Sequence, residues 1–102
     1  MIIVIATVQC HAGQRDQFVA EFQQLVPSVL AEEGCIEYAP TVDADTSLTK
    51  QNVDPDRVTI VEKWESIEAL EAHLVAPHMQ AYRPKVKDFV ESSELRILTI
   101  PA

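Results

Sequence analysis

The first strand-like segment of the chain is apolar on both faces, and this restricts the fold more than any other feature. Residues 2–8 read Ile-Ile-Val-Ile-Ala-Thr-Val, and their β-branched side chains favour an extended strand. Side chains alternate between the two faces of a strand, and here odd and even positions are both apolar. Such a strand needs cover on both sides. Helices of the same chain provide one cover, and a second subunit is the simplest candidate for the other.

Three segments have the apolar spacing of helices. From residue 14 to residue 30 apolar side chains recur every three or four positions, although Pro27 is expected to kink or split this helix, and Gly34 is placed to end it. Ser66 is suited to cap a short helix over residues 67–74. Pro77 suits the first turn of a further helix, whose apolar stripe runs to residue 90.

Strands are predicted at residues 2–8, 35–39, 58–64 and 95–100, with a polar loop over residues 43–56. Pro40 indicates the end or an edge position of the second strand. The order β-α-β-β-α-β is typical of a ferredoxin-like α+β fold, a single domain over residues 1–102 with helices on one face of a four-stranded antiparallel sheet. The uncovered face predicts a homodimer in which two sheets pack face to face.

Cysteine usage and topology together argue against a disulfide. In this topology the third strand lies between the first and second, so Cys10 and Cys35 are separated by two strand spacings, roughly 10 Å. A disulfide requires Cα atoms within about 7 Å.

Two lone cysteines, with no signal peptide and no apolar run of the ~20 residues that span a bilayer, indicate a cytoplasmic protein without membrane attachment.

Composition removes two classes of partner. The chain has only two glycines, Gly13 and Gly34, which lie far apart. Loops that bind nucleotide or dinucleotide phosphates need several glycines close together. It has 8 Lys and Arg against 16 Asp and Glu, a net charge of −8, and nucleic-acid binding needs a basic face. Nucleotide cofactors bound by such loops and nucleic-acid partners are therefore not expected.

The chemistry-bearing residues gather between positions 62 and 82. His73 follows Leu70 by three positions on a predicted helix, so it is expected near the apolar side. A histidine lining a small apolar pocket could take a proton from a phenolic substrate. Glu62 shares a strand face with Trp64, and burial there would raise the pKa of the carboxyl and suit it as a base or as the group that orients a histidine.

Structural roles suit the same residues. Trp64 and Tyr82 fit core packing, His73 fits a hydrogen-bonded core position, and His78 fits the start of a helix. A metal site is not expected, because His73 and His78 are five positions apart across Pro77 rather than four apart on one helix.

A longer pattern resembles a known family. It comprises Gln14 after an Ala-Gly turn, residues 26–30 (Val-Pro-Ser-Val-Leu), 33–35 (Glu-Gly-Cys), 38–40 (Tyr-Ala-Pro), 64–73 (from Trp64 to His73) and 77–79 (Pro-His-Met). These stretches resemble the antibiotic biosynthesis monooxygenase (ABM) family, closest to its bacterial quinol monooxygenase branch, over essentially the whole chain.

The resemblance implies a dimeric α+β barrel and oxygen chemistry without flavin, haem or metal. The substrate then has to supply the electrons, and a deprotonated quinol is rich enough in electrons to reduce O₂. The partners implied are a small aromatic substrate and O₂. The resulting hypothesis assigns these roles: His73 or His78 as the base, Trp64 and Met79 against the ring, and Tyr38 and Tyr82 as hydrogen-bond partners of its oxygens.

Two other functions are kept beside this one. A branch with a similar histidine segment isomerises phosphorylated signalling sugars, and the cluster Arg83, Lys85 and Lys87 would have to hold the phosphate. A non-catalytic dimeric module would fill its pocket with its own side chains. The haem-degrading branch is excluded, because it carries an asparagine on the first strand where this chain has Ala6 and Thr7.

Overall fold

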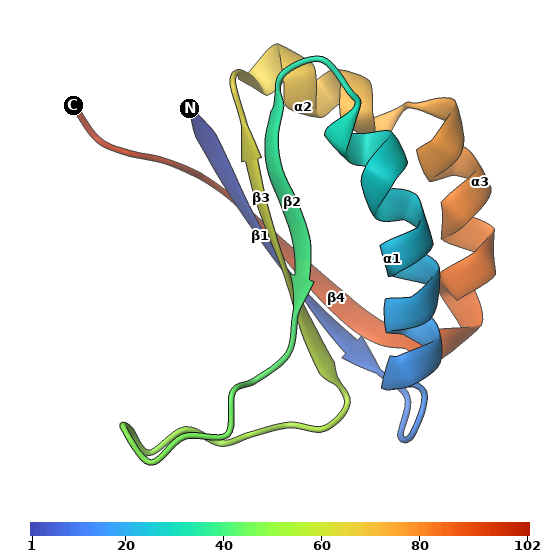
Figure 1. Ribbon diagram of the computed structural model, residues 1–102, viewed down its shortest axis with the longest axis vertical. Helices are drawn as coiled ribbons and strands as arrows, with labels where there is room; N and C mark the ends of the chain where they lie inside the picture. Colours follow the sequence, from blue (N-terminus) through green and yellow to red (C-terminus); the bar gives the residue numbers. More distant parts are fainter.

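The computed structural model describes residues 1–102 and shows one antiparallel sheet with helices on a single face (Figure 1). The elements are β1 (Ile2–Cys10), α1 (Arg15–Leu30), β2 (Cys35–Thr41), β3 (Arg57–Trp64), α2 (Ile67–Leu74), α3 (Pro77–Val86), a short 3₁₀ turn (Lys87–Phe89) and β4 (Val90–Thr99). The strand order β2-β3-β1-β4 places the third strand between the first and second. The predicted ferredoxin-like α+β fold is confirmed.

The core lies between the sheet and the helices. Alternate residues of β1 and β3 point towards the helices and are buried: Val4, Ala6, Val8 and Cys10 on β1, and Val58, Ile60, Glu62 and Trp64 on β3. The stripe of α1 that meets them consists of Phe18, Phe22, Leu25 and Val29. The alternating apolar residues of the two strands therefore face the apolar stripe of helix α1 across one core layer. The core carries Glu62 and His73 as its only buried polar residues.

Two expectations about the helices are wrong in part. Of the two outcomes expected at Pro27, the split does not occur: α1 is one helix of 16 residues, because a proline in its last turn removes a single backbone hydrogen bond. The third helix ends at Val86 rather than residue 90, since Phe89 belongs to the 3₁₀ turn and Val90 already pairs with Cys10. Apolar spacing alone could not separate these segments. Ser66 caps α2 as predicted, accepting a hydrogen bond of 3.1 Å from the Ala69 amide.

The strands are longer than their apolar residues indicate. β4 begins five residues before the predicted start, and its first half is polar and exposed because it pairs on one side only, at the edge of the sheet. β2 is the opposite edge and accommodates Pro40 within the strand. Cys10 and Cys35 are both free, as predicted.

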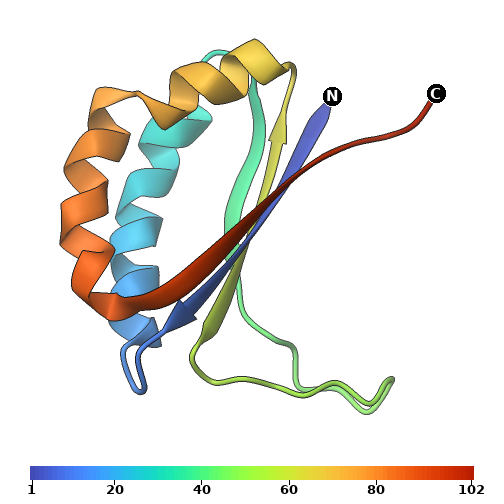
Figure 2. The same cartoon turned by 180° about the vertical axis from the view of Figure 1, so that it is seen from behind.

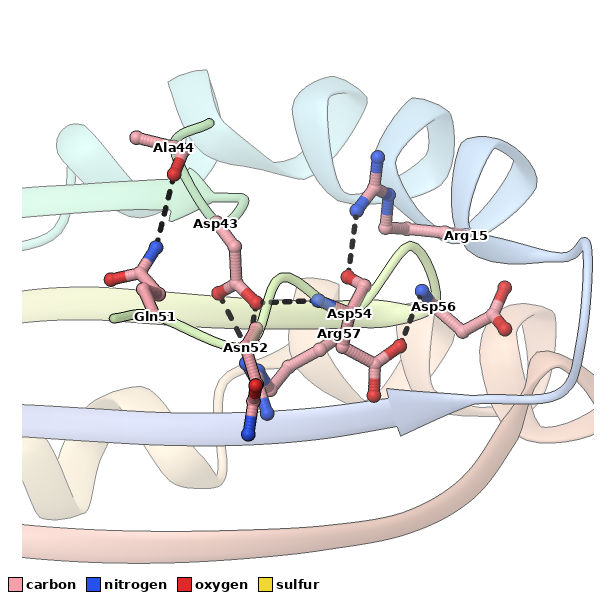
Figure 3. A network of polar contacts seen from close by, with 8 residues as sticks. All are labelled: Arg15, Asp43, Ala44, Gln51, Asn52, Asp54, Asp56 and Arg57. Atoms are coloured by element: carbon pink, nitrogen blue, oxygen red, sulfur yellow. Dashed lines mark hydrogen bonds and ion pairs between the residues drawn. The ribbon is translucent and has the colours of Figure 1, made fainter. Parts of the chain in front are cut away.

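The loop over residues 42–56 projects beyond the end of the sheet (Figures 1 and 2) but is tied at its base. Asp43 pairs with the Arg57 guanidinium and accepts a 2.9 Å hydrogen bond from the Asp54 amide, while Arg15 donates to the Asp54 carbonyl at 3.2 Å (Figure 3). The hydrogen bond from Arg57 holds the pKa of Asp43 below its ordinary value. The network joins the loop to the first turn of α1.

No helix of this chain covers the second face of the sheet (Figures 1 and 2). The strand register places Ile3 and Ile5 of β1 on this face, beside Val61 of β3 and Leu98 of β4. An apolar strip thus runs across the middle of the open face.

None of the helices is long and apolar enough to cross a membrane.

Candidate active site

A cavity of about 310 Å³ lies between the sheet and helices α1 and α3. Seventeen residues line it, twelve of them hydrophobic, which is the usual character of a small-molecule site. Five of the seven residues proposed from the sequence line this cavity: Tyr38, Glu62, His73, Met79 and Tyr82. The remaining two, Trp64 and His78, lie next to the cavity without lining it.

Two tyrosines give the apolar wall its hydroxyl groups. Tyr38, on β2, stacks on Phe22 with ring centroids 4.9 Å apart and meets the edge of His73 at 5.3 Å. Burial raises the pKa of Tyr38, and the charge of Glu62 adds to the effect. Burial also raises the pKa of Tyr82, on α3. Both phenols therefore stay protonated near neutral pH and can donate hydrogen bonds.

Glu62 is a buried carboxyl in the middle of β3. Its side chain points to the helices and accepts a 2.9 Å hydrogen bond from the indole N–H of Trp64. Burial raises the pKa of Glu62, while the Trp64 hydrogen bond and the nearby His73 act in the opposite direction. The raised pKa expected from the sequence is thus confirmed, although Glu62 makes no hydrogen bond to a histidine.

Trp64 supports the site from behind. The residue is fully buried, and its ring lies 4.7 Å from the His73 ring at an interplanar angle of 36°. Because the indole also binds Glu62, one side chain positions two groups that reach the cavity.

His73 lies near the end of α2 with only 2 % of its side chain exposed. Its Nδ1 is 2.8 Å from Oε2 of Glu32, a residue of the turn after α1. A carboxylate accepts hydrogen bonds and cannot donate them, so it places the ring proton of neutral His73 on Nδ1. Nε2 is then the nitrogen left with a lone pair for a molecule in the cavity.

His78 meets the same carboxylate from the other side. It follows Pro77 at the start of α3, and its Nε2 lies 2.7 Å from Oε2 of Glu32. The ring borders a separate groove of about 210 Å³ between α1 and α3, lined also by Glu21 and Lys85. The structure therefore joins His73 and His78 through Glu32, and only His73 reaches the apolar cavity.

Glu32 is the residue that the sequence reasoning missed. It stands three positions after Val29, the last buried residue of the α1 stripe, so the helical phase carries it towards the core. The next residue, Glu33, is exposed. Helical phase was the available signal, but the two partners of this half-buried carboxylate, His73 and His78, lie 41 and 46 positions further along the chain.

Cys35 stands beside this cluster and offers no nucleophile. Burial raises the pKa of its thiol to about 11, and the negative charges of Glu32 and Glu62 contribute to the shift. The reactive form of cysteine is the thiolate, which is scarce at neutral pH under these conditions.

Comparisons with known proteins agree with this architecture. Residues 1–85 match the family described as antibiotic biosynthesis monooxygenase. The chain is 45% identical over 100 residues to "Probable quinol monooxygenase YgiN" of Escherichia coli strain K12, covering 96% of both chains. A crystal structure from Shewanella oneidensis superposes with a TM-score of 0.80 at 30% identity, covering 95% of this chain and 87% of that one. A Pseudomonas aeruginosa structure, at 23% identity and a TM-score of 0.82, covers 99% and 94% respectively and supports the fold. The chain belongs to the antibiotic biosynthesis monooxygenase family.

Proposed function

We propose that this protein oxidises quinols or related polyphenols with O₂, without a bound cofactor and with His73 as the base. The observation that carries the proposal is the placement of His73. Its Nδ1 is held by a carboxylate at 2.8 Å while the ring lines an apolar cavity with two tyrosines. The likeness to a relative named as a quinol monooxygenase supports the substrate class.

The first step is removal of a proton from a quinol hydroxyl by Nε2 of His73. The Glu32 carboxylate stabilises the imidazolium that forms, as an acidic partner does in other histidine bases. Tyr38 and Tyr82 donate hydrogen bonds to the ring oxygens and stabilise the quinol anion. The quinol anion and the protonated His73 attract each other strongly, because they lie in an apolar cavity where the charges are poorly screened.

The anion then passes electrons to O₂. In the oxygenase reaction one oxygen atom enters the ring and the other leaves as water, so a quinol and O₂ give a hydroxyquinone and H₂O. If no oxygen is inserted, the same quinol loses two electrons and two protons and gives a quinone and H₂O₂. In both cases the substrate supplies every electron, and the protein contributes positioning and proton transfer.

The alternative functions fit the site less well. Of the cluster Arg83, Lys85 and Lys87, only Arg83 lines the cavity, and it donates to the Leu74 carbonyl. A phosphorylated sugar would therefore meet one cation that is already hydrogen-bonded. A non-catalytic module would have a filled interior, whereas this one has a cavity of about 310 Å³.

The test is oxygen uptake by chelator-treated protein with a naphthoquinol. We expect a rate above autoxidation, and we expect His73→Asn to lower kcat by roughly 10²- to 10⁴-fold because the base is lost. His11→Asn is the matched control, since His11 is exposed in the turn after β1. A rate no higher than autoxidation, or equal rates for the His73 and His11 variants, would contradict the proposal.

A further inference from the structure

We propose that Glu32, His73 and His78 form a binding site for a divalent transition-metal cation of the Zn²⁺ type, and that the bound cation switches the histidine base off. Each residue offers one donor atom, and the three atoms lie within 4.8 Å of one another. They come from three elements, the turn after α1, the end of α2 and the start of α3. Two imidazoles and one carboxylate are a donor set that Zn²⁺ takes when it keeps a position for water.

The spacing of the donors is close to that of a metal site. Oε2 of Glu32 is 2.8 Å from Nδ1 of His73 and 2.7 Å from Nε2 of His78. Ligands at roughly 2.0–2.2 Å from one Zn²⁺ lie about 3 Å or slightly more from each other. Both contacts thus need to lengthen only slightly, while the two nitrogens draw together around the cation. His78 can make this adjustment, because 30% of its side chain is exposed.

Burial and charge favour a cation at this position. The side chains of His73 and Glu32 are 2% and 13% exposed, so the carboxylate is largely removed from water. Its only hydrogen-bond partners are the two imidazoles. A metal binds the deprotonated carboxylate and the neutral imidazoles, so affinity for the cation should fall at low pH. The more exposed His78 gives the cation a route from the groove between α1 and α3.

The switch rests on the proposed function of His73. Neutral histidine has one ring proton, and without metal it sits on Nδ1, facing Glu32. A cation bound to Nδ1 leaves Nε2 as the only place for that proton. The ring neither gains nor loses a proton, but Nε2 changes from an acceptor to a donor and can no longer take the proton of a quinol.

Metal binding is tested first, on chelator-treated protein titrated with Zn²⁺ by calorimetry and with Co²⁺ by visible absorption. We expect one equivalent per chain. Removing a hydrogen-bond partner of a metal ligand lowers the affinity for the metal roughly 10- to 100-fold. Glu32→Gln and His78→Asn each remove a ligand itself, so each should weaken Zn²⁺ binding by more than this. Glu33→Gln and His11→Asn are matched controls at exposed positions and should leave binding unchanged.

Absence of saturable binding, or equal affinity in the control and cluster variants, overturns the site. Circular dichroism checks the fold of each variant, and His78→Asn keeps the test valid if Glu32→Gln does not fold. Nitrogen-15 NMR of the histidine rings tests the switch without any assay of activity. We expect Zn²⁺ to move the His73 proton from Nδ1 to Nε2, and a tautomer that does not change overturns the switch.

Inhibition separates this inference from the proposed function. We expect Zn²⁺ to suppress oxygen uptake with the naphthoquinol over the same concentrations at which it binds. Full activity with the site occupied overturns the switch. Absence of oxygen uptake with and without Zn²⁺ contradicts the proposed function instead, while the titration and the NMR spectra still decide the metal site and its effect on the ring.

Discussion

Two carboxyl groups near His73 are placed in different environments, and this difference assigns them different roles. Oε2 of Glu32 lies 2.8 Å from Nδ1 of His73 and 2.7 Å from Nε2 of His78. Glu62 has one hydrogen bond, from Trp64, and burial dominates its environment and raises its pKa. Pairs of titratable groups with divergent environments are typical of acid–base sites. Glu32 therefore holds the ring of His73, the base in the proposed function, and Glu62 is the group able to hold a proton beside the cavity.

The buried carboxyl of Glu62 should make stability depend on pH. Its pKa in the folded chain is raised above the ordinary value of 4.5, so the folded state binds this proton more tightly than the unfolded state. The stabilisation is fully present below the ordinary pKa and is lost as pH rises through the raised one. Glu62→Gln keeps an acceptor for Trp64 and removes the titration. We expect the variant to gain stability relative to the wild type between pH 4 and pH 7.5.

Urea unfolding followed by the fluorescence of Trp64, the only tryptophan, measures this difference at both pH values. Glu37→Gln is a suitable control, because Glu37 is a partly exposed carboxylate paired with Lys63 at 3.1 Å on the same sheet. A stability difference between Glu62→Gln and wild type that does not change with pH would show that folding leaves the pKa of Glu62 at its ordinary value.

At the scale of elements, the site depends on a close approach between the turn after α1 and helix α2. Gly34 has a φ of +84°, and a Cβ built there would lie 2.6 Å from Cβ of Ala69. Its carbonyl accepts a 2.8 Å hydrogen bond from the Glu65 amide. This contact brings the turn that carries Glu32 against the helix that carries His73. A glycine thus sets how closely the Glu32 carboxylate approaches His73, the proposed base.

Gly34→Ala should therefore weaken both the fold and the site. Gly13 provides a matched comparison, because its φ is +78° and a Cβ there meets nothing within 4 Å. Both alanine variants lose the freedom of glycine at positive φ, which costs about 1–2 kcal/mol. We expect Gly34→Ala to lose about 1–3 kcal/mol more, because the added methyl group overlaps Ala69. Urea unfolding checks this, and equal losses at the two positions would show that α2 moves aside freely.

The elements differ in how far they could be predicted from sequence. β3 and α1 carry regular apolar periods that reflect burial, so their existence and phase follow from the chain alone. β1 is apolar on both faces, so the sequence predicts the strand but not which of its faces meets the helices. The polar half of β4 could not be predicted, because an exposed edge strand does not alternate between apolar and polar side chains. His73 was expected near the core for the same reason that α1 was. Glu32 required knowledge of which loop meets which helix, and that depends on contacts distant in sequence.

At the scale of the whole molecule, β1 remains covered on one side only. Its even-numbered residues face the helices, whereas Ile3 and Ile5 face outward beside Val61 and Leu98. Sheets with one solvated face usually alternate apolar and polar side chains, and the centre of this face does not. Charged residues such as Lys63, Glu94 and Arg96 are confined to the neighbouring strands on the same face. An apolar centre with a charged surround is the usual anatomy of an interface.

We propose that two copies pack these open faces together, and Ile5→Lys tests it. The register places Ile5 between Val61 and Arg96, so a lysine there puts a charge in the middle of the contact and beside a second positive charge. We expect light scattering to give twice 11.4 kDa for the wild type and 11.4 kDa for the variant. Val75→Lys is the control, because Val75 is 67% exposed at the end of α2, on the helical side of the sheet. Wild-type protein that stays at 11.4 kDa at micromolar concentration, or an Ile5 variant that keeps the doubled mass, would exclude this face as the interface. In that case the second apolar face of β1 would need another cover.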